Sequence, residues 1–407
     1  MLQNRAGEIV SRQAAALLLA LGHGATHWVL ATIYVILPFL GQDLGLSFAQ
    51  IGGLISIFHA ASFLANAGSG ALVDITGRYL TAAWLSLVFG ASGLFLFGFA
   101  SDLVLPVVAI VVIGITHNLW HPAAISLLSR AYPAARGFAL SIHTLGASVG
   151  DILAPTCAGA LMLVLGWQST AMVNALPALI VAGIVAILGP SLFGGGRVPV
   201  ERKPDDASYL GALKALASDR SIVLLCIMAG FRSMTQNGLM LFLPLYLVNE
   251  LKAGPMLVGV AMTGIQAGAL ISGPLAGAMS DKLGRKPVVL ICLAGTSIMI
   301  AAMNTISQAE AFIAAACVLG FALFAVRPVI HGWALDLAPD RMSGSVISLL
   351  FGTQSAFTML VPLVGGLVAD QWGLVATFLL LTVTVMIASL MAGSTITLVF
   401  SPSQLLI

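Results

Sequence analysis

The stretch "GALVDITGR" at residues 70–78 returns as "GAMSDKLGR" at residues 277–285, with glycine, aspartate and arginine at the same spacing. The two stretches are 207 residues apart, and this offset also relates residues in other segments. These further pairs are Gly137 with Gly344, Ser141 with Ser348, Pro155 with Pro362, Gly159 with Gly366, Gly166 with Gly373 and Thr170 with Thr377. A register shared by several separate segments indicates two structurally equivalent halves.

The composition around these repeats is that of a membrane protein. Of the 407 residues, 59% are hydrophobic and 8% are charged, and the mean hydropathy is +1.05. Ordinary soluble domains are about a quarter charged, so these values indicate a polytopic membrane protein. The few basic residues are scattered over short loops rather than gathered on one face, which excludes a nucleic-acid partner.

The apolar runs predict an all-α fold with twelve transmembrane helices, because each run is long enough to cross about 30 Å of hydrocarbon. They lie at 14–40, 48–73, 79–100, 103–130, 137–164, 168–193, 221–248, 254–280, 287–304, 309–336, 343–368 and 374–400. The long polar segment 194–220 divides the chain into two pseudo-symmetric six-helix bundles, residues 1–193 and 221–407. Within that cytoplasmic linker we expect a short amphipathic helix at Leu210–Ala217.

The distribution of basic residues predicts the orientation. Of the 17 lysines and arginines, Arg232 and Arg327 lie inside predicted helices and Lys252 stands alone on one side of the membrane. All the others fall in loops or ends on the opposite side, which the positive-inside rule assigns to the cytoplasm. We therefore expect a multi-pass protein of the bacterial inner membrane with both termini in the cytoplasm.

The repeated G-x-x-x-D-x-x-G-R loop resembles the signature of the major facilitator superfamily, and the resemblance covers the whole chain. It implies secondary transport by alternating access, with helices 1, 4, 7 and 10 lining the cavity. The motif residues would then form a conformational gate: glycines would allow close helix approach, and aspartate and arginine would pair across helix ends. These residues are Gly70, Asp74, Gly77, Arg78, Gly277, Asp281, Gly284 and Arg285.

Within the superfamily, residues 121–155 resemble the fosmidomycin-resistance type of exporter through a His-Pro in helix 4 and a G-x-A-x-S stretch that opens helix 5. The family's glycine-rich antiporter motif appears only as "GDILAPTCAG" at 150–159, where Ala154 and Ala158 replace glycines. Small-residue packing is retained, but the direction of transport stays open, export being one possibility.

Each of the four helices expected to line the cavity carries a polar pair at i, i+4, which places both members on one helical face. The pairs are His23 and His27, His117 and His121, Arg232 and Gln236, and Arg327 and His331. Counting residues along the helices places His27, His117 and the two arginines near the midplane. His23 and His121 form a second tier toward the cytoplasm, and the antiparallel helices 1 and 4 allow the two histidine pairs to face each other as rungs.

The charges predict an anionic substrate. Asp151 on helix 5 is the one acidic residue expected deep in the membrane, against two arginines that cannot discharge. The cavity then has a net positive charge, which a carboxylate or phosphonate on the substrate would balance. The alternative is that Asp151 pairs one arginine while the other serves helix packing. Histidine titrates near pH 6.5, so coupling to protons is chemically available.

We therefore expect a transporter of a small organic anion, coupled to protons, which acts as a monomer in the lipid bilayer without a cofactor. Ser141 and His143 do not share a helical face and no nucleophile motif surrounds them, which excludes an enzyme. The residues expected to bind substrate are His27, Tyr34, His117, Trp120, Arg232, Gln236, Arg327 and His331, and those expected to couple protons are His23, His121 and Asp151.

Three points stay open at this level. Histidines 23, 27, 117 and 121 could instead bind a transition metal or a metal chelate, although nearby arginines would repel a bare cation. A multidrug exporter of lipophilic cations is a further alternative. His59 and His143, taken singly, fit either a packing role or a place on the pathway.

Overall fold

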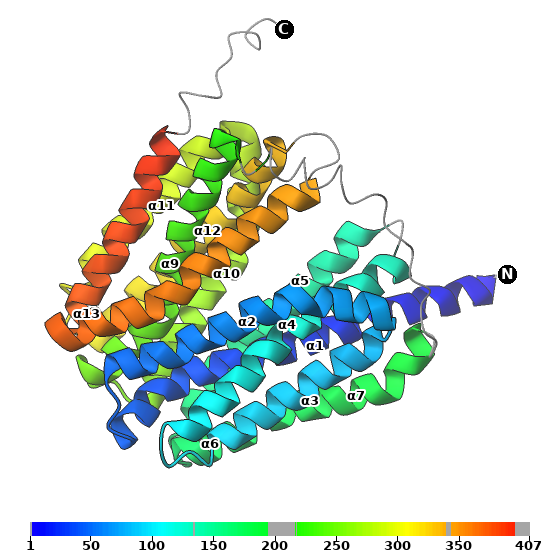
Figure 1. Ribbon diagram of the computed structural model, residues 1–407, viewed down its shortest axis with the longest axis horizontal. Helices are drawn as coiled ribbons and strands as arrows, with labels where there is room; N and C mark the ends of the chain where they lie inside the picture. Colours follow the sequence, from blue (N-terminus) through cyan, green and yellow to red (C-terminus); the bar gives the residue numbers. More distant parts are fainter. Residues whose placement is uncertain (1, 133–134, 194–215, 217, 339–342, 395–407) are drawn as a thin grey trace, which may run out of the picture. The chain divides into compact units, whose positions relative to one another are not determined.

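The computed structural model describes residues 2–132, 135–193, 216, 218–338 and 343–394, and their regular structure is entirely α-helical (Figure 1). Helices satisfy their own backbone hydrogen bonds, which hydrocarbon requires. The helices are α1 (Leu2–Asp43), α2 (Phe48–Thr76), α3 (Tyr79–Phe97), α4 (Val104–Ala131), α5 (Arg136–Leu161), α6 (Trp167–Asn174), α7 (Leu176–Phe193), α9 (Arg220–Asn249), α10 (Pro255–Leu283), α11 (Arg285–Met303), α12 (Ala309–Asp336) and α13 (Ser343–Ser394).

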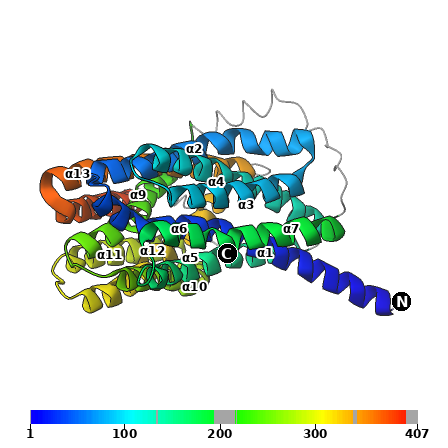
Figure 2. The same cartoon turned by 90° about the horizontal axis from the view of Figure 1, so that it is seen from below.

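Twelve membrane crossings follow from these helices. The described residues contain 11 helical segments that are long and apolar enough to span a membrane. One of these, Trp167–Phe193, consists of α6 and α7, which follow one another along one line (Figure 2). Another, in α13, contains two crossings because Gly373 has φ 82° and ψ 166°, and the orange and red limbs of Figure 1 reverse direction there. The all-α fold is confirmed.

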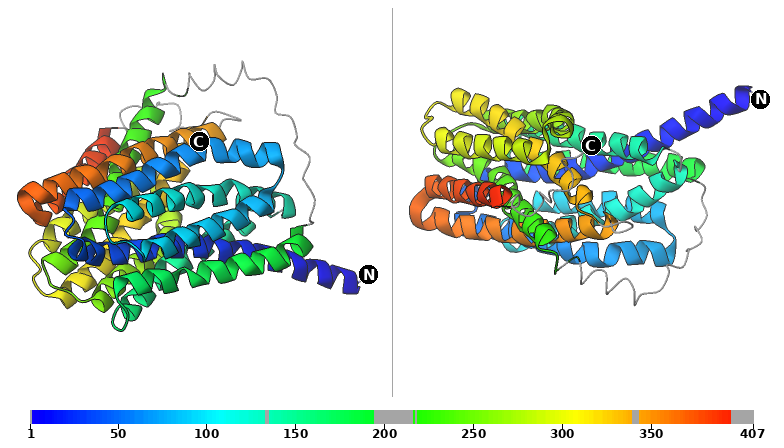
Figure 3. Two further views of the ribbon diagram at one scale, coloured as in Figure 1. Left: turned by 60° about the horizontal axis from the view of Figure 1, so that its bottom comes forward. Right: turned by 90° about the horizontal axis from the view of Figure 1, so that it is seen from above.

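The helix ends differ from the predicted ones mainly at the N-terminus. We expected the first helix to begin near residue 14, whereas α1 already begins at Leu2 and extends beyond its neighbours (Figure 3). The apolar span within α1 starts at Gln13, so the earlier residues continue the helix without being needed to cross hydrocarbon. The amphipathic helix expected at Leu210–Ala217 lies almost entirely outside the described residues.

The helices divide into two compact units that exchange two short segments. The first unit contains described residues 2–46, 57–193 and 253–263, and the second contains 47–56, 264–394 and the described residues from 216 to 252. The start of α2 therefore belongs to the second unit, where Asp370 accepts hydrogen bonds from the backbone N–H groups of Phe48 (2.8 Å) and Ala49 (3.0 Å). In the first unit, Thr263 of α10 donates to the Ile152 carbonyl (2.6 Å). The predicted boundary at 194–220 falls mostly on residues that are not described.

In the first unit, small residues bring α5 against α1 along their length. A Cβ added at Gly146 would lie 2.0 Å from the carbonyl oxygen of Ala20, and one added at Gly150 would lie 2.2 Å from that of Gly24. The two backbones therefore touch, as the G-x-x-x-G spacing of Gly146 and Gly150 favours. This contact fixes which residues of α5 face α1, and so positions the polar groups described below.

The signature loops are alike in backbone and different in side-chain contacts. Gly77 and Gly284 both have positive φ (62° and 88°), a conformation that glycine adopts without a steric penalty. At Gly70 and Gly277 an added Cβ would meet nothing within 4 Å, so the close helix approach expected there is not present.

The expected pairing of aspartate with arginine is present in the second loop. Arg285 forms ion pairs with Asp281 and, through Nε at 2.9 Å, with Asp336 of α12. In the first loop Asp74 instead accepts a hydrogen bond from the Tyr79 hydroxyl (3.2 Å), which in turn accepts one from Arg130 of α4 (2.7 Å). The symmetric expectation was therefore wrong for Asp74, because a tyrosine stands beside it and takes the place of the arginine.

Candidate functional site: a histidine cluster and a buried arginine

Five histidines of the first unit form one group, which we call the histidine cluster: His23, His27, His117, His121 and His143. The ring centroids of His27 and His117 are 5.3 Å apart and those of His23 and His121 are 5.1 Å apart. The predicted rungs between α1 and α4 are therefore confirmed. Contacts along each helix, 4.8 Å from His23 to His27 and 5.6 Å from His117 to His121, close the group.

Asp151 joins the cluster through His27. The His27 Nδ1 atom lies 3.0 Å from the Asp151 Oδ2 atom, and both side chains are about one-quarter exposed (23% and 25%). The alternative in which Asp151 pairs an arginine is therefore not what the structure shows. A carboxylate beside an imidazole can form a charge-assisted hydrogen bond with it.

α5 contributes a second member, which the sequence left open. The His143 ring stacks on His23 at a centroid distance of 3.9 Å and an interplanar angle of 14°. Its Nε2 atom accepts a hydrogen bond from the indole N–H of Trp120 (3.1 Å). Trp120 is fully buried, and its ring fills the space above Gly22. The structure thus places Trp120 as a support of the cluster, and its expected contact with substrate stays a prediction.

Two further polar residues of the first unit, Tyr34 and His59, lie beside this group. Tyr34 is buried on α1, close enough to Asp151 for an electrostatic interaction. His59 packs edge-on against Phe58 at 5.1 Å, and Phe58 in turn contacts the His117 ring at 5.7 Å. His59 is therefore a neighbour of the cluster and not a member of it.

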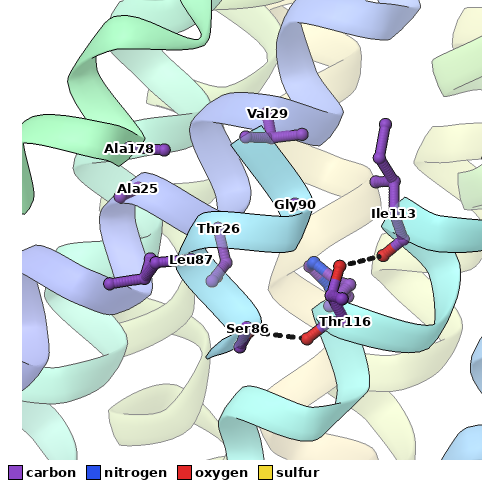
Figure 4. A pocket seen from close by; sticks show the side chains of 10 residues that line it. Ala25, Thr26, Val29, Ser86, Leu87, Gly90, Ile113, Thr116 and Ala178 are labelled. Carbon is purple, nitrogen blue, oxygen red and sulfur yellow. Dashed lines mark hydrogen bonds between the residues drawn. The ribbon is translucent and has the colours of Figure 1, made fainter. Parts of the chain in front are cut away.

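A small cavity lies beside His117, between α1, α3, α4 and α7 (Figure 4). Its volume is about 10 Å³, which is the room that one water molecule needs. The nearby hydroxyls of Ser86 and Thr116 already donate to backbone carbonyls, at 2.6 Å and 2.8 Å. The cavity can therefore hold a water molecule next to the cluster but no organic substrate.

A larger cavity of about 330 Å³ opens between α1, α5 and α7. Apolar side chains such as Leu17 and Leu153 line it and are more than half exposed (59% and 51%). Because no charged residue lines it, this space does not suit an anion.

The polar residues of the second unit gather around Arg232 on α9. Its side chain is buried (3% exposed), Nη2 donates to the Leu323 carbonyl of α12 (2.7 Å), and Nε has no hydrogen-bond partner. Arg327 and His331, both on α12, lie close enough to interact electrostatically with one another and with Arg232. One turn along α9, the buried Gln236 Oε1 atom also has no partner. The structure therefore brings Arg232, Arg327 and His331 together and places Gln236 one turn from Arg232 on the same helix.

The carboxylates of the second unit do not compensate Arg232. Within the described residues of this unit, Asp219, Glu250, Asp281, Glu310 and Asp336 lie at helix ends, and Asp370 binds the start of α2. None of the ion pairs formed by the described part of the chain includes Arg232. This buried cation thus has neutral hydrogen-bond acceptors around it and the capacity to bind an anion.

The geometry gives no support to the metal alternative. In the described ranges, no group of three or more histidine, cysteine, aspartate or glutamate side chains is arranged to hold a metal ion. The cluster rings pack against one another by faces and edges, so their nitrogen atoms do not converge on one point.

His143 is the functional candidate that sequence reasoning did not assign. A signal for it exists in "HTLGASVGD", where His143, Gly146 and Gly150 recur at i, i+3 and i+7 and so share one face of a helix. If the two glycines bring that face against another helix, the histidine must face the same helix. This spacing therefore predicts that His143 faces the helix that carries His23.

The fold and these polar residues define a class of protein: a polytopic all-α membrane transporter with twelve crossings in an internal repeat. The family model of the Major Facilitator Superfamily matches residues 19–245 and 225–402. The chain therefore belongs to this superfamily and is a transport protein, not an enzyme.

Three similar proteins illustrate this membership. The sialic acid transporter NanX of Escherichia coli is 22% identical over 86% of this chain and 86% of its own length. The fosmidomycin resistance protein of Escherichia coli is 24% identical over 87% of this chain and 86% of its own length. The crystal structure of a bacterial homologue of the human lysosomal transporter Spinster has a TM-score of 0.79 and 16% identity, covering 95% of this chain and 97% of that one. These relatives indicate transport of organic substrates or drug efflux.

Proposed function

We propose that this protein transports a small organic anion and couples its movement to protons. The observation that carries the proposal is Arg232, a buried guanidinium with one hydrogen bond to a neutral carbonyl and an Nε atom without a partner. A carboxylate or phosphonate would satisfy the free donors in a bidentate geometry and offset the buried charge. Arg327, His331 and Gln236 would bind the rest of the anion.

The histidine cluster supports the proton-coupling part of the proposal. Asp151 and His27 form a pair in which either group can gain or lose a proton, and His23 and His121 extend it by ring contacts. His117 lies beside a cavity that is large enough for one water molecule. Coupling and substrate binding would then depend on different units, with His27 and His117 on the proton side.

Two features of the relatives fit this proposal. NanX is named for an acid, and the fosmidomycin resistance protein is named for resistance to a drug. The first supports an anionic substrate and the second makes export the direction to test first. We also propose that the protein acts as a monomer in the inner membrane, with both termini in the cytoplasm and the signature loops acting as a gate on that side.

The test is transport in proteoliposomes with an imposed pH gradient and a clamped membrane potential. The compounds are carboxylates, phosphonates, metal chelates with acidic arms, and a lipophilic cation as the drug-efflux alternative. We expect an anion to accumulate only when the gradient is present.

Arg232→Gln should abolish that transport, and Arg232→Lys should not restore it, because lysine lacks the planar fork. Arg220→Gln is the matched control, since Arg220 lies at the exposed start of the same helix. Equal transport of an anion by wild type and Arg232→Gln would refute the proposal, and transport of the lipophilic cation alone would establish drug efflux instead.

A further inference from the structure

The stacked histidines of α1 and α5 differ in which ring nitrogen is free. The His23 Nδ1 atom lies 2.8 Å from the backbone carbonyl oxygen of His143. A carbonyl oxygen only accepts hydrogen bonds, so Nδ1 of His23 carries a hydrogen and donates it. In the neutral ring the lone pair is then on Nε2, which is buried and has no hydrogen-bond partner. His23 therefore has an open proton-acceptor atom inside the cluster.

The equivalent atom of His143 is occupied. The indole nitrogen of Trp120 can only donate, and it donates to His143 Nε2 at 3.1 Å. A proton added to that atom would face the indole N–H directly and would break the hydrogen bond. The Trp120 ring has little freedom to turn away, because it is fully buried and lies over Gly22.

The two rings cannot both be cations. They stack at 3.9 Å, and two positive charges at that distance in a buried site repel strongly. One added proton is therefore the limit for the pair, and the free Nε2 atom of His23 is where it is accepted.

Building on the proposed proton coupling, we propose that His23 is the proton-accepting member of this pair and that Trp120 is a positioning residue that keeps His143 neutral. The proton comes from water and binds the Nε2 lone pair, while Nδ1–H keeps its bond to the carbonyl. His23 becomes an imidazolium and no other bond breaks.

The titratable groups that face His23 are histidines, and a cation at His23 requires these neighbouring rings to be neutral. On α1 and α4 its ring meets His27 at 4.8 Å and His121 at 5.1 Å, and both of these contact His117. On α5, beside His143, Asp151 bonds to His27 and not to His23 itself. The sequences of α6 and α7, which also pack against α1, contain no titratable residue, and that of α3 contains only Tyr79 at its end.

The direct test follows the ring nitrogens by NMR of ¹⁵N-histidine-labelled protein in lipid nanodiscs over a range of pH, with signals assigned by single substitutions. In wild type we expect the His23 signal to titrate and the His143 signal to remain that of a neutral ring with hydrogen on Nδ1. Trp120→Phe keeps an aromatic ring but removes the N–H, so His143 should then compete with His23 for the one added proton and its signal should shift with pH.

Trp28→Phe is the matched control. It removes an indole N–H that donates to an amide oxygen, Asn174 Oδ1 at 3.0 Å, so the titration of the cluster should not change. A wild-type titration at His143, or an unchanged neutral His143 in Trp120→Phe, would overturn the inference.

A second pair of variants covers the case in which Trp120→Phe fails to fold. Glutamine at either position is polar and cannot be protonated. His143→Gln keeps the backbone carbonyl that binds His23, so the pH dependence of transport should be retained. His23→Gln should abolish it, and the opposite result would refute the inference.

The inference and the proposed function can fail separately. If a pH gradient drives transport but His23 does not titrate, the inference is wrong and the proposed function stands. If His23 titrates but a pH gradient drives no transport, the proton site exists and the proposed coupling is wrong.

Discussion

The two units of this protein share a repeat and differ in the kind of charge they bury. In the first unit the paired positions on α1 and α4 are histidines, which can lose their charge, and Asp151 accompanies them. In the second unit the corresponding helices carry Arg232, which is buried, and Arg327, which is exposed, and the charge of both is permanent. A group that can change its charge is suited to proton coupling. A group with a permanent charge is suited to holding an anion throughout the transport cycle. On this difference we base the proposal that the first unit couples protons and the second binds the anion.

The largest effects are expected from variants that separate substrate binding from proton coupling. Arg232→Gln should weaken binding of the anion by roughly 10- to 100-fold, the loss expected for a charge-assisted hydrogen bond. Asp151→Asn should leave binding intact but prevent accumulation driven by a pH gradient. Binding is measured by the stabilisation of the detergent-solubilised protein against heating, and accumulation is measured in proteoliposomes.

The control for this pair is exchange of labelled for unlabelled substrate without a pH gradient. Asp151→Asn should exchange at close to the wild-type rate, whereas Arg232→Gln should exchange far more slowly at the same substrate concentration. If Asp151→Asn loses binding to the same extent as Arg232→Gln, the roles are not divided between the units and the comparison fails.

The next largest effect is expected at the backbone contact between α5 and α1, the helix that carries His23 and His27. Gly146→Ala would place a Cβ 2.0 Å from the Ala20 carbonyl oxygen, so the helices must separate and the free energy of unfolding should fall by about 1–3 kcal/mol. In the second unit, Gly230 faces the ring of Phe357 on α13 at 2.8 Å, a side chain and not a backbone. Gly230→Ala should therefore cost less.

Thermal unfolding of the purified protein measures these differences. Gly137→Ala serves as the control, because a Cβ there meets nothing within 4 Å. A Gly146→Ala protein as stable as the control would show that α1 and α5 do not need this backbone contact.

These contacts also explain how far the sequence alone could go. Apolar runs and the repeat were sufficient for the fold, because hydrocarbon permits few structures and the repeat fixes the register of both halves. The i, i+4 pairs correctly predicted that His27 meets His117 and that His23 meets His121. Helix periodicity gives the face of a residue but not its partner on another helix, so the bond from Asp151 to His27 and the support of His143 by Trp120 were not predicted.

The signature loops give a further comparison of the two units, with smaller expected effects. In the first unit the Tyr79 hydroxyl joins Asp74 to Arg130, whose guanidinium also lies 4.4 Å above the Tyr79 ring. Tyr79→Phe keeps the ring contact and removes the two hydrogen bonds, so we expect a loss of about 0.5–1.5 kcal/mol in unfolding free energy. Thermal unfolding in parallel with Thr76→Val, which removes a hydroxyl bonded only to backbone groups of its own helix and of the following loop, isolates the contribution of the link between helices.

The smallest effect is expected at the matching position of the second unit. There α12 presents Asp336 where α4 presents Arg130, and Arg285 binds it in place of the tyrosine. Asp336 is about half exposed (53%) and Arg285 keeps its pair with Asp281, so Asp336→Asn should change stability by less than about 1 kcal/mol. Raising the salt concentration should shrink this difference, because solvent-exposed ion pairs are screened, but should leave the effect of Tyr79→Phe unchanged. A larger loss of unfolding free energy for Asp336→Asn than for Tyr79→Phe would mean that the contacts of the second loop contribute more to stability than those of the first.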